Sequence, residues 1–183
     1  MEEAFPPPYP LFSRTFKKGY MNMNENITKR AEAARQNFLS GYGCAQAVLL
    51  AYADLTGIEE KTLARLGSSF GGGMGRLREV CGAVSGAFAV LGFLCGYDDP
   101  ADKEGKSRHY ADVRELARRI TEKSGCGSIV CREILASRSI PNEAGGEAEA
   151  RTPEYYHKRP CTELVYVAAE TLGEMLWEKG IFK

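Results

Sequence analysis

The side chains of this sequence best suited to chemistry are its six cysteines: Cys44, Cys81, Cys95, Cys126, Cys131 and Cys161. None of them forms a Cys-x2-Cys pair, so the patterns typical of zinc ribbons, ferredoxins and thioredoxins are absent. The shortest gap, Cys126-x4-Cys131, is not a standard ligand spacing either. Spacing alone gives weak support for a metal site, and the sequence shows no Ser–His–Asp or paired-carboxylate hydrolase pattern.

The positions of four cysteines relative to the expected helices say more than their spacing. Cys44, Cys81 and Cys161 stand at the predicted first turn of a helix, and Cys131 lies within the opening turns of another. A helix N-terminus stabilises a thiolate and can lower the pKa of a cysteine. If these helix ends converge, the result is a thiolate cluster suited to a metal ion, an iron–sulfur cluster or disulfide exchange. The alternative is four inert core residues, because cysteine is often buried, and we expect Cys95 to be one such core residue.

A glycine-rich run, Gly71-Gly-Gly-Met-Gly75, precedes Cys81. It lacks the Gly-Lys-Ser/Thr ending of a nucleotide-binding P-loop, and no strand pattern precedes it. The run is either a tight turn that brings the backbone close to neighbouring helices or a cradle of backbone N–H groups for an anion. In a combined interpretation it hydrogen-bonds thiolate or sulfide at Cys81, with Arg76 and Arg78 adding positive charge. The cofactor-binding candidates besides the cysteines are therefore Gly73, Gly75 and Arg76.

The two histidines are weaker candidates for a functional site than the cysteines. His157 stands four residues before Cys161 and is a possible ligand or proton carrier, although a lone histidine in a loop is more often simply solvated. His109 lies in a charged helical segment, and we expect it at the surface.

Composition narrows the class of protein. The 183 residues suit one domain, and 24 basic against 24 acidic side chains give a formal net charge of zero. That balance argues against nucleic acid or an anionic membrane as a partner. The longest apolar run, about 83–97, is shorter than the ~20 residues of a membrane-spanning helix. The N-terminus does not resemble a signal peptide, so we expect a cytoplasmic protein with reduced cysteines unless they bind metal or do redox work.

Helical periodicity dominates the chain and predicts an all-α bundle of about six to seven helices. We expect residues 1–22 to be a flexible tail, with Met21 or Met23 as possible natural starts, and residues 23–183 to be a single domain. The glycine-rich loop leads into a central apolar helix near 80–95, whose small residues allow close packing or a homodimer contact. Residues 138–160 are predicted to be a long loop, and loops of that length are usually functional or disordered.

The sequence resembles the C_GCAxxG_C_C family, described as redox-active proteins with four cysteines and a Cys-Gly-Ala-x-x-Gly motif. The resemblance covers roughly residues 25–180, and the matching segments are 41–48, 70–76, 79–87, 127–135 and 161–170. It implies that Cys44, Cys81, Cys131 and Cys161 are the family's four cysteines. Some relatives are exported in the way usual for proteins with prosthetic groups, which implies an iron–sulfur or similar cofactor. Cys126 departs from the family pattern, where an aromatic residue is expected; it is a fifth ligand, a resolving thiol or simple variation.

Three hypotheses of different classes follow. The leading one is a redox or electron-transfer protein in which Cys44, Cys81, Cys131 and Cys161 hold an iron–sulfur cluster. The second is a metal-free thiol–disulfide oxidoreductase in which two of these cysteines form a reversible disulfide. The third is a binding module in which the same four residues hold a structural zinc ion. The first two imply a redox partner protein or a small-molecule redox couple.

Overall fold

The computed structural model describes the backbone of residues 14–182 and the side chains of residues 24–182. In this part of the chain the fold is an all-α bundle, as the sequence predicted, and the one β-type contact is an isolated antiparallel bridge between Val80 and Val130. The helices are α1 (Arg14–Leu39), α2 (Cys44–Ala51), α3 (Ala53–Thr56), α4 (Glu60–Ser68), α5 (Gly71–Met74), α6 (Gly82–Cys95), α7 (Lys103–Ser124), α8 (Cys131–Ala136), α9 (Pro153–Lys158) and α10 (Cys161–Glu178).

The structure has more helical segments than the six or seven expected, because the sequence pattern missed short ones. One predicted stripe is broken at Tyr52 into α2 and α3, while α9 lies within the predicted long loop. Helix α5 is a helix by hydrogen bonding only, since Gly72 and Gly73 inside it have positive φ angles of 65° and 72°. That segment is therefore closer to the tight turn that its glycines predict.

The first helix begins at Arg14, earlier than the sequence suggested. The last proline before it is Pro10, so no residue of 14–22 is a strong helix breaker. Residues 14–22, expected to be a tail, are thus helical, and residues 1–13 lie outside the described residues. A separate flexible tail and a domain from residue 23 onward stay predictions.

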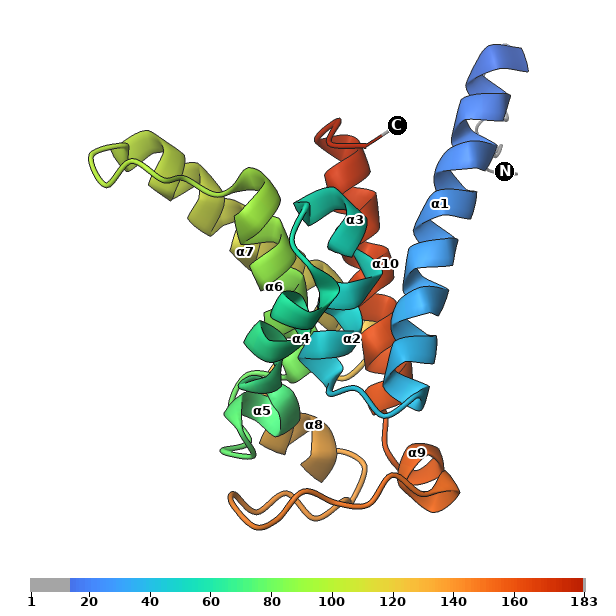
Figure 1. Cartoon of the computed structure of the whole chain (residues 1–183), viewed down its shortest axis with the longest axis vertical. Coiled ribbons are helices and arrows are strands. Elements are labelled where there is room, and N and C mark those ends of the chain that lie inside the picture. The colour runs from blue at the N-terminus through green and yellow to red at the C-terminus, as the bar shows by residue number, and fades with distance from the viewer. Residues whose placement is uncertain (1–13, 183) are drawn as a thin grey trace, which may run out of the picture.

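The core forms where α1, α2, α6 and α10 pack together (Figure 1). Helix α6 lies against α2 at very short range, because a Cβ at Gly86 would stand 2.8 Å from the carbonyl oxygen of Ala45. On the opposite side of α2, the buried Tyr52 hydroxyl donates a hydrogen bond of 2.7 Å to the Ala169 carbonyl of α10. These contacts fix the position of α2 relative to α6 and α10.

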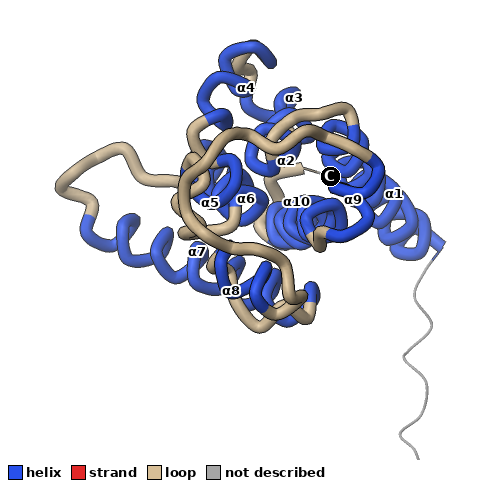
Figure 2. The backbone as a smooth tube through the Cα atoms, turned by 90° about the horizontal axis from the view of Figure 1, so that it is seen from below, coloured by secondary structure: helices blue, strands red, loops and turns tan. Residues whose placement is uncertain are grey.

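The starts of α2, α6 and α10 lie at the same end of the bundle, where α5, α8 and α9 also lie (Figure 1). The connection between α8 and α9, residues 137–152, crosses this end, as the view from below shows (Figure 2). The long connection, the glycine-rich turn and the four helix starts therefore surround one region of the molecule.

Candidate functional site

Each of the four family-type cysteines stands at a helix start. Cys44, Cys131 and Cys161 are the first residues of α2, α8 and α10, and Cys81 is the N-cap of α6. Cys44 and Cys81 are buried, with 8% and 6% of their surface exposed, while Cys131 and Cys161 are half-buried. All six cysteines of the chain are free thiols in this structure.

Backbone pairing brings Cys81 and Cys131 side by side. The bridge between Val80 and Val130 is flanked by two hydrogen bonds, from the Cys81 N–H to Ile129 (2.8 Å) and from the Cys131 N–H to Glu79 (2.6 Å). The start of α8 is thereby fastened to the start of α6. This pairing joins segments 50 residues apart in the chain, and no periodic pattern in the sequence predicts it.

Cys44 meets the same region through a close helix contact. A Cβ at Gly82, the residue after Cys81, would stand 3.1 Å from the Cys44 Cβ and 2.7 Å from the Phe70 carbonyl oxygen. Glycine is required there because any side chain would push α2 and α6 apart. The glycine of the Cys-Gly-Ala motif thus sets the separation between Cys44 and Cys81.

Cys161 completes the group from α10. Its thiol lies close enough to that of Cys44 for their interaction to be the leading cause of the raised pKa of Cys44. Cys44 also acts electrostatically on Cys81 and on Cys131. The structure therefore brings together Cys44, Cys81, Cys131 and Cys161, which we call the four-cysteine cluster.

Burial is the leading cause of the raised pKa of Cys81 and of Cys131, although both residues lie at helix starts. Desolvation raises the pKa of Cys81 to about 12, although hydrogen bonds from the N–H groups of Ala83 and Val84 act in the opposite direction. Burial also raises the pKa of Cys131. The expected lowering of thiol pKa by the helix N-termini is thus wrong for these residues, because removing a thiolate from water costs more than the first helical turn returns.

The glycine-rich turn packs closely against Cys131, whereas the sequence suggested a contact with Cys81. A Cβ at Gly73 would stand 2.6 Å from the Cys131 Cβ. Gly75 has an open surrounding, with only the Ser69 carbonyl oxygen near its Cβ position. The structure therefore places the turn against Cys131, and its predicted hydrogen bonding at Cys81 stays a prediction.

Positive charge reaches the cluster from Arg78 and not from Arg76. Arg78 is 4% exposed and lowers the pKa of Cys131 by its charge and by a hydrogen bond, although burial outweighs it. The Arg76 side chain turns away, to the Gly145 carbonyl (2.8 Å) and to Glu149 (2.9 Å). Arg76 thus holds the 137–152 connection, and its predicted role beside a cofactor stays a prediction.

A cavity of about 310 Å³ adjoins the cluster beneath the 137–152 connection. Its charged lining side chains are Arg76, Arg78, Arg151, Arg159 and Glu149, and we call it the arginine pocket. The charges of Arg78 and Arg159 act on Cys131, and that of Arg151 acts on Cys44. The pocket is therefore close enough to the thiols for its charges to influence them.

Aromatic side chains also lie beside the cluster, and one of them, Tyr155, lines the arginine pocket. Tyr155 of α9 lies near Cys44 and Cys161, and burial, followed by these two neighbours, raises its pKa to about 12. The Arg151 guanidinium stacks on the rings of Phe38 and Tyr155, at 4.8 and 4.6 Å from their centroids. The segment 151–159 consequently forms part of the site, although the sequence offered only the length of the loop as a signal for it.

The donor set fits a thiolate-bound metal chemically, although the side chains do not form a ready-made array. Within residues 24–182, no three His, Cys, Asp or Glu side chains are already arranged to hold a metal ion. Four thiols, two buried and two half-buried, nevertheless share one region, and metal sites commonly close around their ion as they bind it. Binding would require side-chain rotations at the helix starts.

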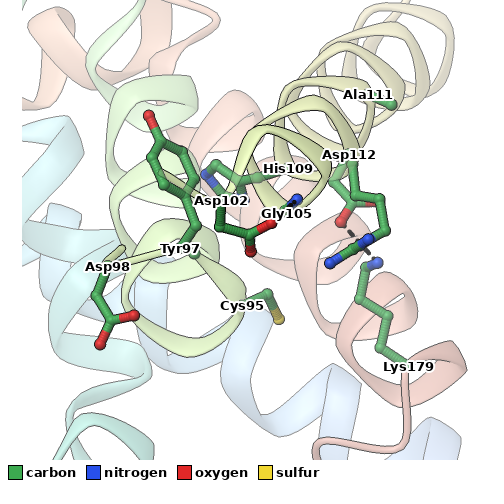
Figure 3. A pocket seen from close by; sticks show the side chains of 11 residues that line it. Cys95, Tyr97, Asp98, Asp102, Gly105, His109, Ala111, Asp112 and Lys179 are labelled. Atoms are coloured by element: carbon green, nitrogen blue, oxygen red, sulfur yellow. Dashed lines mark hydrogen bonds and ion pairs between the residues drawn. The ribbon is translucent and has the colours of Figure 1, made fainter. Parts of the chain in front are cut away.

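The remaining sequence candidates lie elsewhere. The Cys126 thiol hydrogen-bonds within its own turn, to the Ser124 carbonyl at 3.7 Å. His157 is exposed, which agrees with the solvated interpretation. Cys95, expected in the core, is half-buried and lines a separate cavity of about 530 Å³ (Figure 3).

His109 lines the same separate cavity and is half-buried, not at the surface as expected (Figure 3). Its Nδ1 is buried without a hydrogen-bond partner among the described residues. Beside it, Lys179 pairs with Asp112 at 2.7 Å, so the cavity joins the end of α6 to α7 and the end of α10. This cavity gathers one thiol only and is distinct from the four-cysteine cluster.

Comparison with known proteins gives one match. A family model with the description "Putative redox-active protein (C_GCAxxG_C_C)" matches residues 42–175, which include all members of the four-cysteine cluster. No curated protein and no solved structure matches the chain. In the part of the chain that the structure describes, no helix has the length and apolar character needed to cross a membrane.

Proposed function

The chain belongs to the C_GCAxxG_C_C redox-active family, and on this premise we propose that its four-cysteine cluster binds an iron–sulfur cluster for electron transfer. The observation that carries the proposal is the meeting of four thiols from four separate helix starts. Four thiolates are the usual ligand set of [2Fe–2S] and [4Fe–4S] clusters. Such a cluster, when bound, supplies reversible one-electron transfer.

The raised thiol pKa values support metal binding over simple thiol exchange. A buried thiol such as Cys81, with its pKa at about 12, is almost entirely protonated at neutral pH and is a slow nucleophile. A bound cation reverses this balance, because its charge stabilises the thiolates in place of water. The protein side of the site then contributes Arg78 beside Cys131, whose positive charge favours the reduced state of a nearby redox centre.

A second candidate rests on the direct interaction between Cys44 and Cys161. These two thiols could form a reversible disulfide, releasing two protons and two electrons that reduce the disulfide of a partner to two thiols. Cys161 is half-buried and therefore accessible to such a partner, whereas Cys44 would be the buried resolving thiol. Zinc held by all four cysteines is the structural alternative.

Anaerobic purification, followed by a visible spectrum and analysis of iron, zinc and acid-labile sulfide, tests the proposal. Brown protein that contains iron and sulfide is expected. Colourless protein with one zinc ion per chain would indicate the structural alternative. Metal-free protein that also fails chemical reconstitution would contradict the proposal, and free-thiol counts after mild oxidation would then test the Cys44–Cys161 disulfide.

A matched pair of variants separates ligands from other cysteines. Cys131→Ser is expected to lose most of the iron and sulfide, because a serine hydroxyl is a poor ligand for these metals. Cys95→Ser, in the separate cavity, is expected to keep the full content. Equal cofactor content in the two variants would contradict the assignment of the four-cysteine cluster.

A further inference from the structure

The arginine pocket concentrates positive charge in a molecule whose formal net charge is zero. Arg76, Arg78, Arg151 and Arg159 line one cavity of about 310 Å³. The side chains of Arg78 and Arg159 are only 5% and 10% exposed, so water screens them poorly. Buried guanidinium groups are costly unless anionic partners compensate them.

A single carboxylate provides the ion pairs of this pocket within the described residues. Glu149 accepts two hydrogen bonds of 2.8 Å from one terminal nitrogen of Arg159 and one of 2.9 Å from Arg76. Its distance from Arg78 is 3.7 Å. One negative charge thus faces three guanidinium groups, with Arg151 as a fourth that stacks on aromatic rings. The charge of the pocket is far from balanced.

The carboxylate reaches the pocket on a segment that has few other attachments. Glu149 belongs to the 137–152 connection, and its neighbouring residues 143–151 are exposed. Besides Glu149, the segment is held to the glycine-rich turn by backbone groups: Gly145 exchanges hydrogen bonds with Arg76, and the Glu143 carbonyl accepts one from Arg78. These bonds are few, so displacement of the Glu149 side chain would loosen the segment over the pocket.

Two of the four arginines also carry backbone strain, which in the described residues other than glycine is shared only by Met74 and Ser139. Arg76 and Arg78 have φ angles of 67° and 62°, a left-handed conformation that costs a residue with a side chain of the order of 1 kcal/mol. A simple anchor for a surface segment requires neither buried cations nor strained ones. Strain that directs charged side chains into a cavity is typical of a binding site.

We propose that the arginine pocket binds a small molecule through its carboxylate or phosphate group, and that Glu149 occupies the pocket as an internal substitute when the ligand is absent. Guanidinium groups recognise both kinds of oxyanion by paired hydrogen bonds. The ligand would lie beside Cys131, because the charges of Arg78 and Arg159 are close enough to act on the thiol of that residue. The inference goes beyond the proposed function and does not depend on which metal, if any, the cysteines hold.

Isothermal titration calorimetry of the full chain at constant ionic strength tests this inference, with inorganic phosphate and succinate as the two probes. An internal competitor reduces apparent affinity by the fraction of time that it occupies the site. Glu149→Gln is therefore expected to bind at least one probe roughly ten-fold more tightly than the natural sequence. The probe that gains more identifies the preferred oxyanion, phosphate or carboxylate.

Two controls make the result specific to the pocket. Glu147→Gln removes the same charge from an exposed position two residues away and should leave the affinity unchanged. Adding Arg76→Gln to Glu149→Gln should abolish the gain; Arg76 is preferred to Arg159 because its side chain is more exposed, 24% against 10%, and its loss is better tolerated. Circular dichroism of each variant verifies that the fold is retained.

Three experimental outcomes would overturn the inference. Saturable binding that is equal in Glu149→Gln and in the natural sequence, or no binding of either probe, would show that Glu149 is only an anchor for the segment. An equal gain in Glu147→Gln would show a general charge effect. Because iron content is not measured, failure here is distinct from failure of the proposed electron-transfer function.

Discussion

Burial and helix position act in opposite directions on the thiols of the four-cysteine cluster. Each cysteine begins or caps a helix, where backbone N–H groups favour a thiolate, yet burial raises the pKa of Cys81 to about 12. The buried thiol of Cys81 is therefore protonated at physiological pH in the metal-free protein. Chemistry at this thiol would begin only when a cation or an oxidant removes its proton.

The different burial of the four thiols predicts an order of chemical modification in the metal-free, reduced protein. Iodoacetamide should label Cys131 and Cys161 before Cys44 and Cys81, because the first two are half-buried and the other two are almost inaccessible. Since the pKa of Cys131 is raised, its labelling rate should increase about ten-fold per pH unit from pH 7 to 8. Peptide mass spectrometry at short times measures both effects, with urea-unfolded protein as the control. Labelling of Cys81 at the rate of Cys131 would contradict the burial argument.

A single glycine next to Cys131 allows a second prediction. Gly73→Ala should lower the free energy of unfolding by several kcal/mol, because the new Cβ would stand 2.6 Å from the Cys131 Cβ and 3.0 Å from backbone atoms, and φ is +72°. Gly57→Ala is the matched control: φ is +66° and no atom lies within 4 Å of the Cβ position, so only about 1 kcal/mol of backbone strain is expected. Urea denaturation compares the two. Equal losses would mean that the glycine-rich turn is not packed against Cys131.

Close contact between α2 and α6 determines the position of two of the four thiols. The contact depends on Gly82 and Gly86, which let the backbones approach to a distance that no larger residue permits. The small residues of α6 thus serve the interior of the monomer, where Gly86 is buried against Ala45. The homodimer contact suggested by the same small residues stays a prediction.

Alanine substitutions at two glycines of α6 should affect stability differently, because only one of these glycines packs closely against α2. Gly86→Ala places a Cβ 2.8 Å from the Ala45 carbonyl oxygen and should lower the free energy of unfolding by about 1–3 kcal/mol. Gly92→Ala meets only His109 Nε2, at 3.8 Å, and should be neutral or stabilising by up to about 1 kcal/mol through helix propensity. Thermal or urea unfolding provides the comparison. A stable Gly86→Ala variant would refute the close contact.

The elements of this fold were largely predictable, whereas their meeting points were not. The sequence pattern predicted α6, α7 and α10 nearly to their ends, because α7 and α10 each carry an apolar stripe and α6 is a long apolar run. The bridge between Val80 and Val130 is a single pair without a repeating pattern, so no periodicity predicts it. The sequence also could not predict that burial would outweigh the helix N-termini, since acidity depends on the tertiary surroundings of each thiol.

The side chains that line the arginine pocket could not be predicted from the sequence either. Arg76 and Arg78 were visible beside the glycine-rich run, but Arg159 and Glu149 belong to a segment known from the sequence only for its length. Their association depends on how the 137–152 connection crosses the bundle (Figure 2). Composition sums charges over the whole chain and conceals such a local excess.

At the scale of the molecule, the arginine pocket gathers basic side chains at the end of the bundle where the helix starts lie, although the total charge is balanced. The Glu149 carboxylate holds the 137–152 connection over that end, and its pKa is lowered because Arg76 and Arg159 outweigh the effect of burial. A lowered folded-state pKa means that Glu149 contributes fully above the ordinary glutamate pKa. The contribution decreases as the pH falls through the lowered value.

Acidification should therefore release the 137–152 connection before the bundle unfolds. Hydrogen–deuterium exchange, compared at pH 7 and at about pH 3 after correction for intrinsic rates, should show lost protection at the Gly145 N–H, which bonds to Arg76. In Glu149→Gln the protection should be low at both pH values, because the amide has no charge to lose. Protection of Gly145 that is independent of pH in the natural sequence would contradict this role for Glu149.

The order of the cysteines along the chain has a consequence for biosynthesis. Cys44 and Cys161 are separated by most of the chain, and α10, which carries Cys161, also packs on α1 and bonds to Tyr52. Contacts of such high sequence separation form late, because a long loop must close first. During translation α10 emerges after the other helices described here, so until then the nascent protein presents at most three of its four clustered thiols. Any cofactor that needs all four thiols can therefore be acquired only after α10 has emerged, and its insertion is tied to the docking of that helix.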